Sequence, residues 1–319
     1  MLKRYYFLIL SVCVLVGCTH HGQKTSPVST EESGKSTKQY RQTNAFTQVD
    51  VQGRVNIHLH TGYKTPQILL TGDPRDLAQV KTEVSGTTLY LIVGNGYPRY
   101  GAVNADIRGR FLNRLSYKGS GLITGRQLHT SFLELYLANQ GTTQLGGTIG
   151  LQKLEVVGGG LTKISGITSH DLQIRLKEKP KVQLTGFVTL SKLNVDGEGW
   201  LSLYWVKSYH LKVVAKKAAK IQLAGIVNRL EVDLWGAARF KGRYLRAQRS
   251  FVRTHDKSVA EISAVNHQST LATDASDIYY YNIPDTRADF MAFNGSVLNM
   301  REWSLFELQE FNRYNKQFP

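Results

Sequence analysis

Basic side chains are concentrated in one window of this chain, where together they could bind anions. The formal net charge is +16 over 319 residues. Between residues 207 and 253 only two acids, Glu231 and Asp233, oppose twelve basic residues. These are Lys207, Lys212, Lys216, Lys217, Lys220, Arg229, Arg239, Lys241, Arg243, Arg246, Arg249 and Arg253. We take them as candidate polyanion-binding residues; a solvated face that favours solubility is the alternative.

Side chains that could catalyse a reaction or hold a metal are sparse. The sequence has no Gly-x-Ser-x-Gly elbow, His-Glu-x-x-His helix or phosphate-binding loop. His58 and His60 alternate on an expected strand and share its outer face, but no third ligand can be named. Glu231 and Asp233 lie near Arg229, as a lyase would need. We expect no metal, no cofactor and no catalysis, with a polysaccharide-acting enzyme of the β-helix type as the alternative.

Aromatic residues stand within and just before the basic window and could contact a ligand. They are Trp200, Tyr204, Trp205, Tyr209 and Trp235. Exposed aromatic rings could stack on sugar rings, and buried ones could stack on one another in a core. The sequence leaves both interpretations open.

The N-terminus predicts export. Lys3 and Arg4 precede an apolar run over residues 5–16 that is shorter than the ~20 residues a membrane span needs. The run ends at Leu15-Val16-Gly17-Cys18, which is similar to the lipobox of bacterial lipoproteins. That similarity implies cleavage before Cys18 and a thiol that carries acyl chains such as palmitate. An uncut N-terminal anchor is the alternative.

Cys18 would then be the first residue of an exported lipoprotein. The only other cysteine, Cys13, lies within the expected signal peptide of residues 1–17, so the exported part has no disulfide and no cysteine metal site. Thr19 lacks the aspartate-type signal for inner-membrane retention, which favours the outer membrane. Residues 18–44 are mostly Ser, Thr, Gly, Lys and Gln, and are expected to form a flexible tether.

The remaining sequence repeats with a period of about 20 residues. Short turn-like triplets such as Gly158-Gly159-Gly160 and Gly197-Glu198-Gly199 recur at that spacing, and alternating apolar runs stand on either side of them. Strict alternation marks a strand with one buried face, and a fixed period marks stacked units. Leu184 and Leu223 should therefore point inward, and Gln183 and Gln222 outward.

This pattern predicts an all-β fold, a parallel β-helix with rungs of about 20 residues over residues 45–300. Each rung would supply two or three short strands, stacked roughly 4.8 Å apart. A β-sandwich is the alternative, although it would need Asn-Gly or Asp-Gly hairpin turns that are scarce here. Asp73 and Pro74 predict the start of one short helix. Residues 301–319 are expected to form a C-terminal capping helix and tail, since Ser304 and Glu307 have capping-box spacing.

Several of these segments resemble the bacterial auto-transporter adhesin family with the head-GIN domain. The resemblance rests on Phe46-Thr47-Gln48-Val49-Asp50-Val51, Gly72-Asp73-Pro74, the turns at Gly119-Ser120-Gly121 and Gly158-Gly159-Gly160, and Ile278-Tyr279-Tyr280-Tyr281. It implies an exported or lipid-anchored β-helical protein without an established activity. The chain departs from the glycine pattern at Lys179-Pro180-Lys181 and Lys217-Ala218-Ala219.

Charge, export and resemblance together predict a non-catalytic binding or adhesion module. A membrane would be one partner, through the lipid on Cys18. Lipopolysaccharide, acidic polysaccharide or extracellular DNA would be the polyanionic partners, bound without specific nucleic-acid recognition. The sequence does not indicate the oligomeric state.

Overall fold

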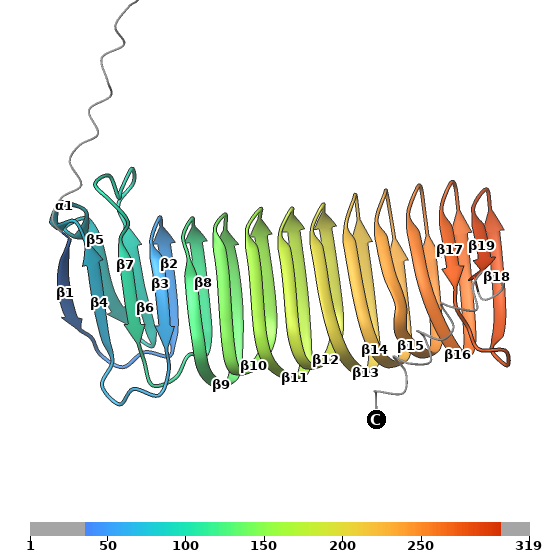
Figure 1. The fold of residues 1–319 in the computed structure, drawn as a ribbon, viewed down its shortest axis with the longest axis horizontal. Coiled ribbons are helices and arrows are strands. Elements are labelled where there is room, and N and C mark those ends of the chain that lie inside the picture. The colour runs from blue at the N-terminus through green and yellow to red at the C-terminus, as the bar shows by residue number, and fades with distance from the viewer. Residues whose placement is uncertain (1–35, 301–319) are drawn as a thin grey trace, which may run out of the picture. The chain divides into compact units, whose positions relative to one another are not determined.

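The fold is a parallel β-solenoid, as predicted. The computed structural model describes residues 36–300, and Figure 1 shows their strands stacked side by side along one direction. Parallel pairing runs without interruption from β8 through β16 and on to β19. The β-sandwich alternative is wrong, because successive turns of the chain pair in parallel rather than as hairpins.

The elements form three groups. The first contains β1 (Thr37–Gln42), β2 (Gln48–Gly53), β3 (Asn56–His60), β4 (Gln67–Gly72), α1 (Pro74–Leu77), β5 (Val80–Ser85), β6 (Thr88–Val93), β7 (Asn104–Arg108) and β8 (Arg114–Gly119). The second contains the long strands β9 (Ile123–Asn139), β10 (Thr142–Gly158), β11 (Leu161–Glu178), β12 (Lys181–Gly197), β13 (Trp200–Lys216), β14 (Lys220–Leu234), β15 (Arg239–Thr254) and β16 (Val259–Thr273). The third contains β17 (Asp277–Tyr280), β18 (Arg287–Phe293) and β19 (Ser296–Asn299).

Each rung from β9 to β16 is one long bent strand rather than the two or three short strands that we expected. In β12, a first run over residues 181–185 and a second run over residues 192–196 are joined by a corner where the pairing register shifts. Figure 1 shows these strands bending back at one end and turning sharply at the other. The hydrogen-bonded ladder continues on both sides of the corner, so the two runs of each rung form one strand.

Side chains alternate in both runs as the sequence predicts. Leu184 and Leu223 are each 1% exposed, whereas Gln183 is exposed and Gln222 is half-buried. Leu184 pairs with Leu203, which pairs with Leu223, so equivalent leucines stack in one continuous core. That core is the main source of stability, since the described strands bury Leu, Val and Ile along their whole stack.

The predicted turn triplets close every rung. Gly158, Gly197 and Gly236 take left-handed backbone angles there, and Glu178 and Lys217 take the same conformation on the rungs without this glycine. The left-handed turn geometry is thus the same in the rungs that lack this glycine. Stacking is close at Gly141, where a Cβ would lie 2.3 Å from the carbonyl oxygen of Gly121. Only glycine fits at such an approach.

The N-terminal part departs from a pure parallel solenoid. Strands β5 and β6 form an antiparallel pair, and β4 pairs antiparallel with β7. The predicted helix between them is confirmed: α1 begins at Pro74, and the Asp73 side chain accepts a hydrogen bond from the Arg75 backbone N–H.

The expected tether boundary at residue 44 is wrong. Residues 37–42 form β1, which pairs antiparallel with β4. The Arg41 guanidinium donates hydrogen bonds to the Val80 carbonyl at 2.7 Å and to Thr82 Oγ1 at 2.8 Å. Backbone pairing to an open sheet edge therefore orders a segment with no apolar core of its own.

Three expectations lie outside the described residues: the signal peptide of residues 1–17, the lipidated Cys18 and the capping helix in residues 301–319. They stay predictions. Within residues 36–300, no helix combines the length and apolar character needed to cross a bilayer.

Candidate binding face

The outward side chains of the first runs of β9 to β15 form a face that we call the cationic face. Its charged members are Arg126, Lys163, Lys181, Lys220, Arg239 and Lys241. Gln144, Gln183 and Gln222 stand between them, and Lys220 pairs directly with Arg239. Among the described residues, no acid occupies an outward position of these runs from β9 to β15; Glu261, paired with Lys241, is the first one on β16.

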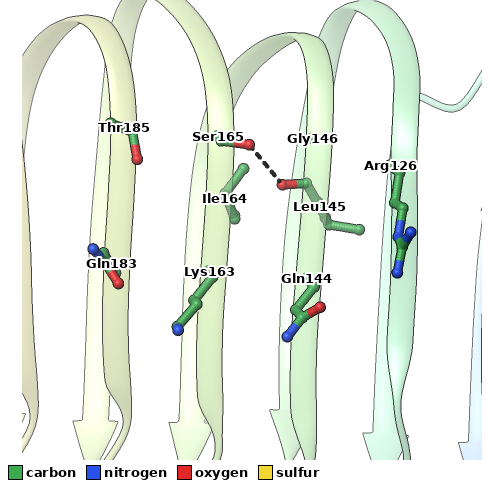
Figure 2. A pocket seen from close by; sticks show the side chains of 9 residues that line it. All are labelled: Arg126, Gln144, Leu145, Gly146, Lys163, Ile164, Ser165, Gln183 and Thr185. Atoms are coloured by element: carbon green, nitrogen blue, oxygen red, sulfur yellow. Dashed lines mark hydrogen bonds between the residues drawn. The ribbon is translucent and has the colours of Figure 1, made fainter.

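A hollow of about 440 Å³ opens on the cationic face. Figure 2 shows Gln144, Lys163 and Gln183 in a row on three adjacent strands, with Arg126 on the next strand along. Their Cα atoms are register partners across β10, β11 and β12. The Ser165 hydroxyl is held by a 3.5 Å hydrogen bond to the Leu145 carbonyl. The hollow thus offers amide groups and two cations, which together suit a ligand with hydroxyl and acidic groups.

A second hollow of about 470 Å³ adjoins the first through Arg126, which lines both. His58 and His60 line it from β3, on the outer face as predicted. His58 Nδ1 lies 2.6 Å from Thr124 Oγ1, and His60 Nε2 lies 3.5 Å from an Asp106 carboxylate oxygen. No set of three or more His, Cys, Asp or Glu side chains in residues 36–300 is arranged to hold a metal ion.

The twelve basic residues of the sequence window do not form one patch. Lys220, Arg239 and Lys241 share the cationic face, as the repeat predicts. The second runs carry Lys212, Lys216, Arg229, Arg249 and Arg253, while Lys207 and Arg246 lie near the corner and Lys217 lies in a turn. Arg243 is half-buried, with its guanidinium 4.8 Å from the Tyr281 ring centroid and 5.1 Å from that of Tyr244.

Acids offset several cations of the second runs. Arg229 lies 2.7 Å from Glu231, and Arg253 lies 2.9 Å from Asp233. Glu231 and Asp233, the two acids considered for a lyase, thus each pair with an arginine. In the turn, Lys217 lies 3.0 Å from Asp196, and its hydrogen bond holds the pKa of that carboxyl below the usual range.

None of the five aromatic residues within and just before the window belongs to the buried core. Tyr209 is 79% exposed and Trp205 is 39% exposed. Trp235 stacks on His255 with ring centroids 3.8 Å apart. The interpretation as core aromatics is therefore wrong, and the rings of Tyr209, Trp205 and Trp235 are accessible.

The sequence window missed Arg126, Lys163 and Lys181, which lie upstream of it. Their signal was the repeat itself, because Lys163 stands at the same phase as Lys241, four rungs later. Charge density along the sequence does not reveal the cationic face, because the face is formed by residues from different rungs.

Comparison with known proteins gives several similar solved structures and one matching family. A crystal structure described as a putative adhesin from Parabacteroides distasonis has a TM-score of 0.48 at 12% identity, covering 83% of this chain and 97% of that one. A putative lipid binding protein from the same species has a TM-score of 0.46 at 14% identity, covering 84% and 98%. A putative adhesin from Bacteroides fragilis has a TM-score of 0.29 at 16% identity, covering 82% and 96%. A comparison with curated proteins gives no significant match.

The family evidence comes from sequence and covers most of the solenoid. The profile of one family matches residues 45–190 and again residues 172–284. Its description names an adhesin and no enzymatic activity. The chain belongs to the family described as putative auto-transporter adhesin, head GIN domain.

Proposed function

We propose that this protein is an exported binding module, anchored through lipid on Cys18, that holds polyanions on its cationic face without catalysing a reaction. The observation that carries the proposal is the run of cations without a carboxylate from β9 to β15. Like charges gathered on one face cost stability unless solvent or an anionic partner offsets their repulsion. A bound polyanion would supply that offset.

The spacing of the face suits a polymer. Adjacent parallel strands stand about 4.8 Å apart, so the cations recur at multiples of one rung. A linear polyanion with regularly spaced charges could contact several rungs at once. Lipopolysaccharide, acidic polysaccharide and extracellular DNA are polyanions that an exported protein would meet, and the adhesin description of the family supports a binding role.

Binding of polygalacturonate at two salt concentrations tests the proposal. Affinity should fall steeply with salt, because bound polyanions release counterions. The triple variant Lys163→Gln, Lys220→Gln, Lys241→Gln should bind weakly and lose most of the salt dependence. The matched control, Lys212→Gln, Lys216→Gln, Arg249→Gln, removes equal charge from the second runs and should bind like the wild type. Equal losses in both triples would mean that net charge, and not the cationic face, sets the affinity.

The anchor needs its own test, because Cys18 lies outside the described residues. Metabolic labelling with palmitate should label the wild type and leave Cys18→Ala unlabelled and uncut. Fractionation should place the labelled protein in the outer membrane. An unlabelled wild type would contradict the lipid anchor and leave the binding proposal standing.

A further inference from the structure

At one corner of the solenoid the residue with positive φ is aromatic, whereas at neighbouring corners it is glycine. Gly147, Gly166, Gly186 and Gly225 all have positive φ at the corner of their rungs. On β13 the corner residue with positive φ is Trp205, with φ of +69°, directly before Val206, the register partner of Gly225. Bulky residues rarely adopt this conformation, and where they persist the strain often accompanies a functional role.

A second exposed ring lies beside it. Phe187 on β12 is 74% exposed, and its ring centroid lies 6.1 Å from that of Trp205, with the planes tilted by 55°. The register partner of Phe187 on β11 is Thr168, so a rung of this solenoid closes without an aromatic residue at this position. Folding does not require Phe187 to be aromatic.

The pair lies next to the hollow of about 440 Å³ on the cationic face. Thr185, which lines that hollow, precedes Phe187 by two residues, and its register partner Tyr204 directly precedes Trp205. Aromatic rings beside amide, hydroxyl and cationic groups offer an apolar face and hydrogen-bonding groups together. Sugar rings with acidic substituents carry the complementary combination of C–H faces, hydroxyls and carboxylates.

We infer that Phe187 and Trp205 form a stacking platform for the sugar rings of an acidic polysaccharide. This inference rests on the proposed function and narrows its ligand class. Arg126 and Lys163 bind the acidic groups, Gln183 and Thr185 bind hydroxyls, and the two rings hold the adjacent sugar. A lipid surface would not need this row of amide groups beside the platform.

The test compares two polyanions, polygalacturonate, which has sugar rings, and polyglutamate, which has none. Phe187→Thr introduces the residue type of its register partner, Thr168. The control, Phe251→Ser, does the same at a distant exposed site, since the register partner of Phe251 is Ser269. Phe187→Thr should weaken polygalacturonate binding about three- to tenfold, as expected for one aromatic contact, and leave polyglutamate binding unchanged. Phe251→Ser should change neither. Trp205→Asn, which tolerates the left-handed backbone, is the second platform variant and should behave like Phe187→Thr.

The outcomes distinguish the stacking platform from polyanion binding by the cationic face. Equal polygalacturonate binding by the wild type and both platform variants would overturn the stacking platform and leave the polyanion proposal intact. Equal losses for both polymers, or tighter binding to anionic vesicles or duplex DNA than to polygalacturonate, would also overturn it. Absence of binding to every polyanion would overturn the proposed function and the platform with it.

Discussion

At the scale of single residues, one step along a strand exchanges core for solvent. Leu184 is 1% exposed, and its neighbour Gln183 is exposed. Leu184→Ala should lower the free energy of unfolding by about 2–5 kcal/mol, through lost apolar burial and a cavity. Gln183→Ala should stay within about 0.5 kcal/mol of the wild type. Urea unfolding of both variants measures the difference, and equal losses would contradict the alternation on which the core depends.

The turns give a residue-scale prediction of opposite sign. Glu178 is exposed and has φ of +69° at a position where other rungs have glycine. Glu178→Gly should raise the free energy of unfolding by roughly 0.5–1 kcal/mol, since relief of a left-handed backbone exceeds the entropy cost of glycine. Lys177→Gly, one residue earlier within β11, should instead lower it by a similar amount. Destabilisation by both variants would show that the turn tolerates Glu178 without strain.

Residue-level prediction succeeded where the periodicity of one strand decides the answer. Alternation alone placed Leu184 and Leu223 in the core and His58 and His60 on the outer face. It could not predict the positive φ of Trp205 at a corner, because that position depends on register shifts between β12, β13 and β14. Those shifts are set by the contacts of neighbouring rungs and leave no local signal.

At the scale of elements, one ion pair links two neighbouring strands. Arg114 on β8 lies 2.6 Å from a carboxylate oxygen of Glu134 on β9, and the two residues are register partners. The hydrogen bond from Arg114 lowers the pKa of the Glu134 carboxyl. A carboxyl whose folded pKa is lowered stabilises the fold above its unfolded pKa, and this stabilisation is lost as the pH falls through the folded pKa.

Glu134→Gln should therefore reduce the stability difference between pH 7 and pH 3 relative to the wild type. Urea unfolding at the two pH values measures it. Glu83→Gln is the control, because among residues 36–300 Glu83 has no ion-pair partner. A wild-type pH dependence that survives in Glu134→Gln would mean that the acid sensitivity arises elsewhere.

Turns were the elements most open to prediction, because their glycines recur at a fixed phase. The boundaries of strands were not, since the corners of β9 to β16 keep the ladder continuous. Strand β1 could not be expected from its composition, which lacks apolar residues apart from Tyr40, itself 67% exposed. Its order comes from pairing with the free edge of β4, which is distant in sequence, and from the hydrogen bonds of Arg41, which composition does not reveal.

At the scale of the whole solenoid, stacking redistributes charge. The basic residues of one sequence window lie on the cationic face, at the corners, in the turns and on the second runs. They are spread in this way because every rung passes through all four of these regions. Positions one rung apart meet instead, which assembles Lys163, Lys220 and Lys241 from β11, β14 and β15 into one face. In such a fold the repeat phase of a cation, rather than its sequence neighbours, decides which ligand it can touch.

The core also changes along the stack, and this predicts where unfolding begins. Rungs β10 to β13 bury mainly Leu, Val and Ile, whereas the later rungs bury Thr254, Gln268, Thr270 and Ser276. Buried hydroxyls and amides that bond to each other replace apolar burial with smaller net gains.

Because each rung contacts only its neighbours, local stability should follow this gradient. Native-state hydrogen exchange should show the strongest protection in β10 to β13 and weaker protection in β16 to β18 than in β2, β3 and β6 at the opposite end. The N-terminal strands are the internal control, since they also lie near an end of the stack but bury an apolar core that includes Val51, Ile57 and Leu91. Equal protection at both ends would mean that distance from an end, and not the composition of the core, sets the order of opening.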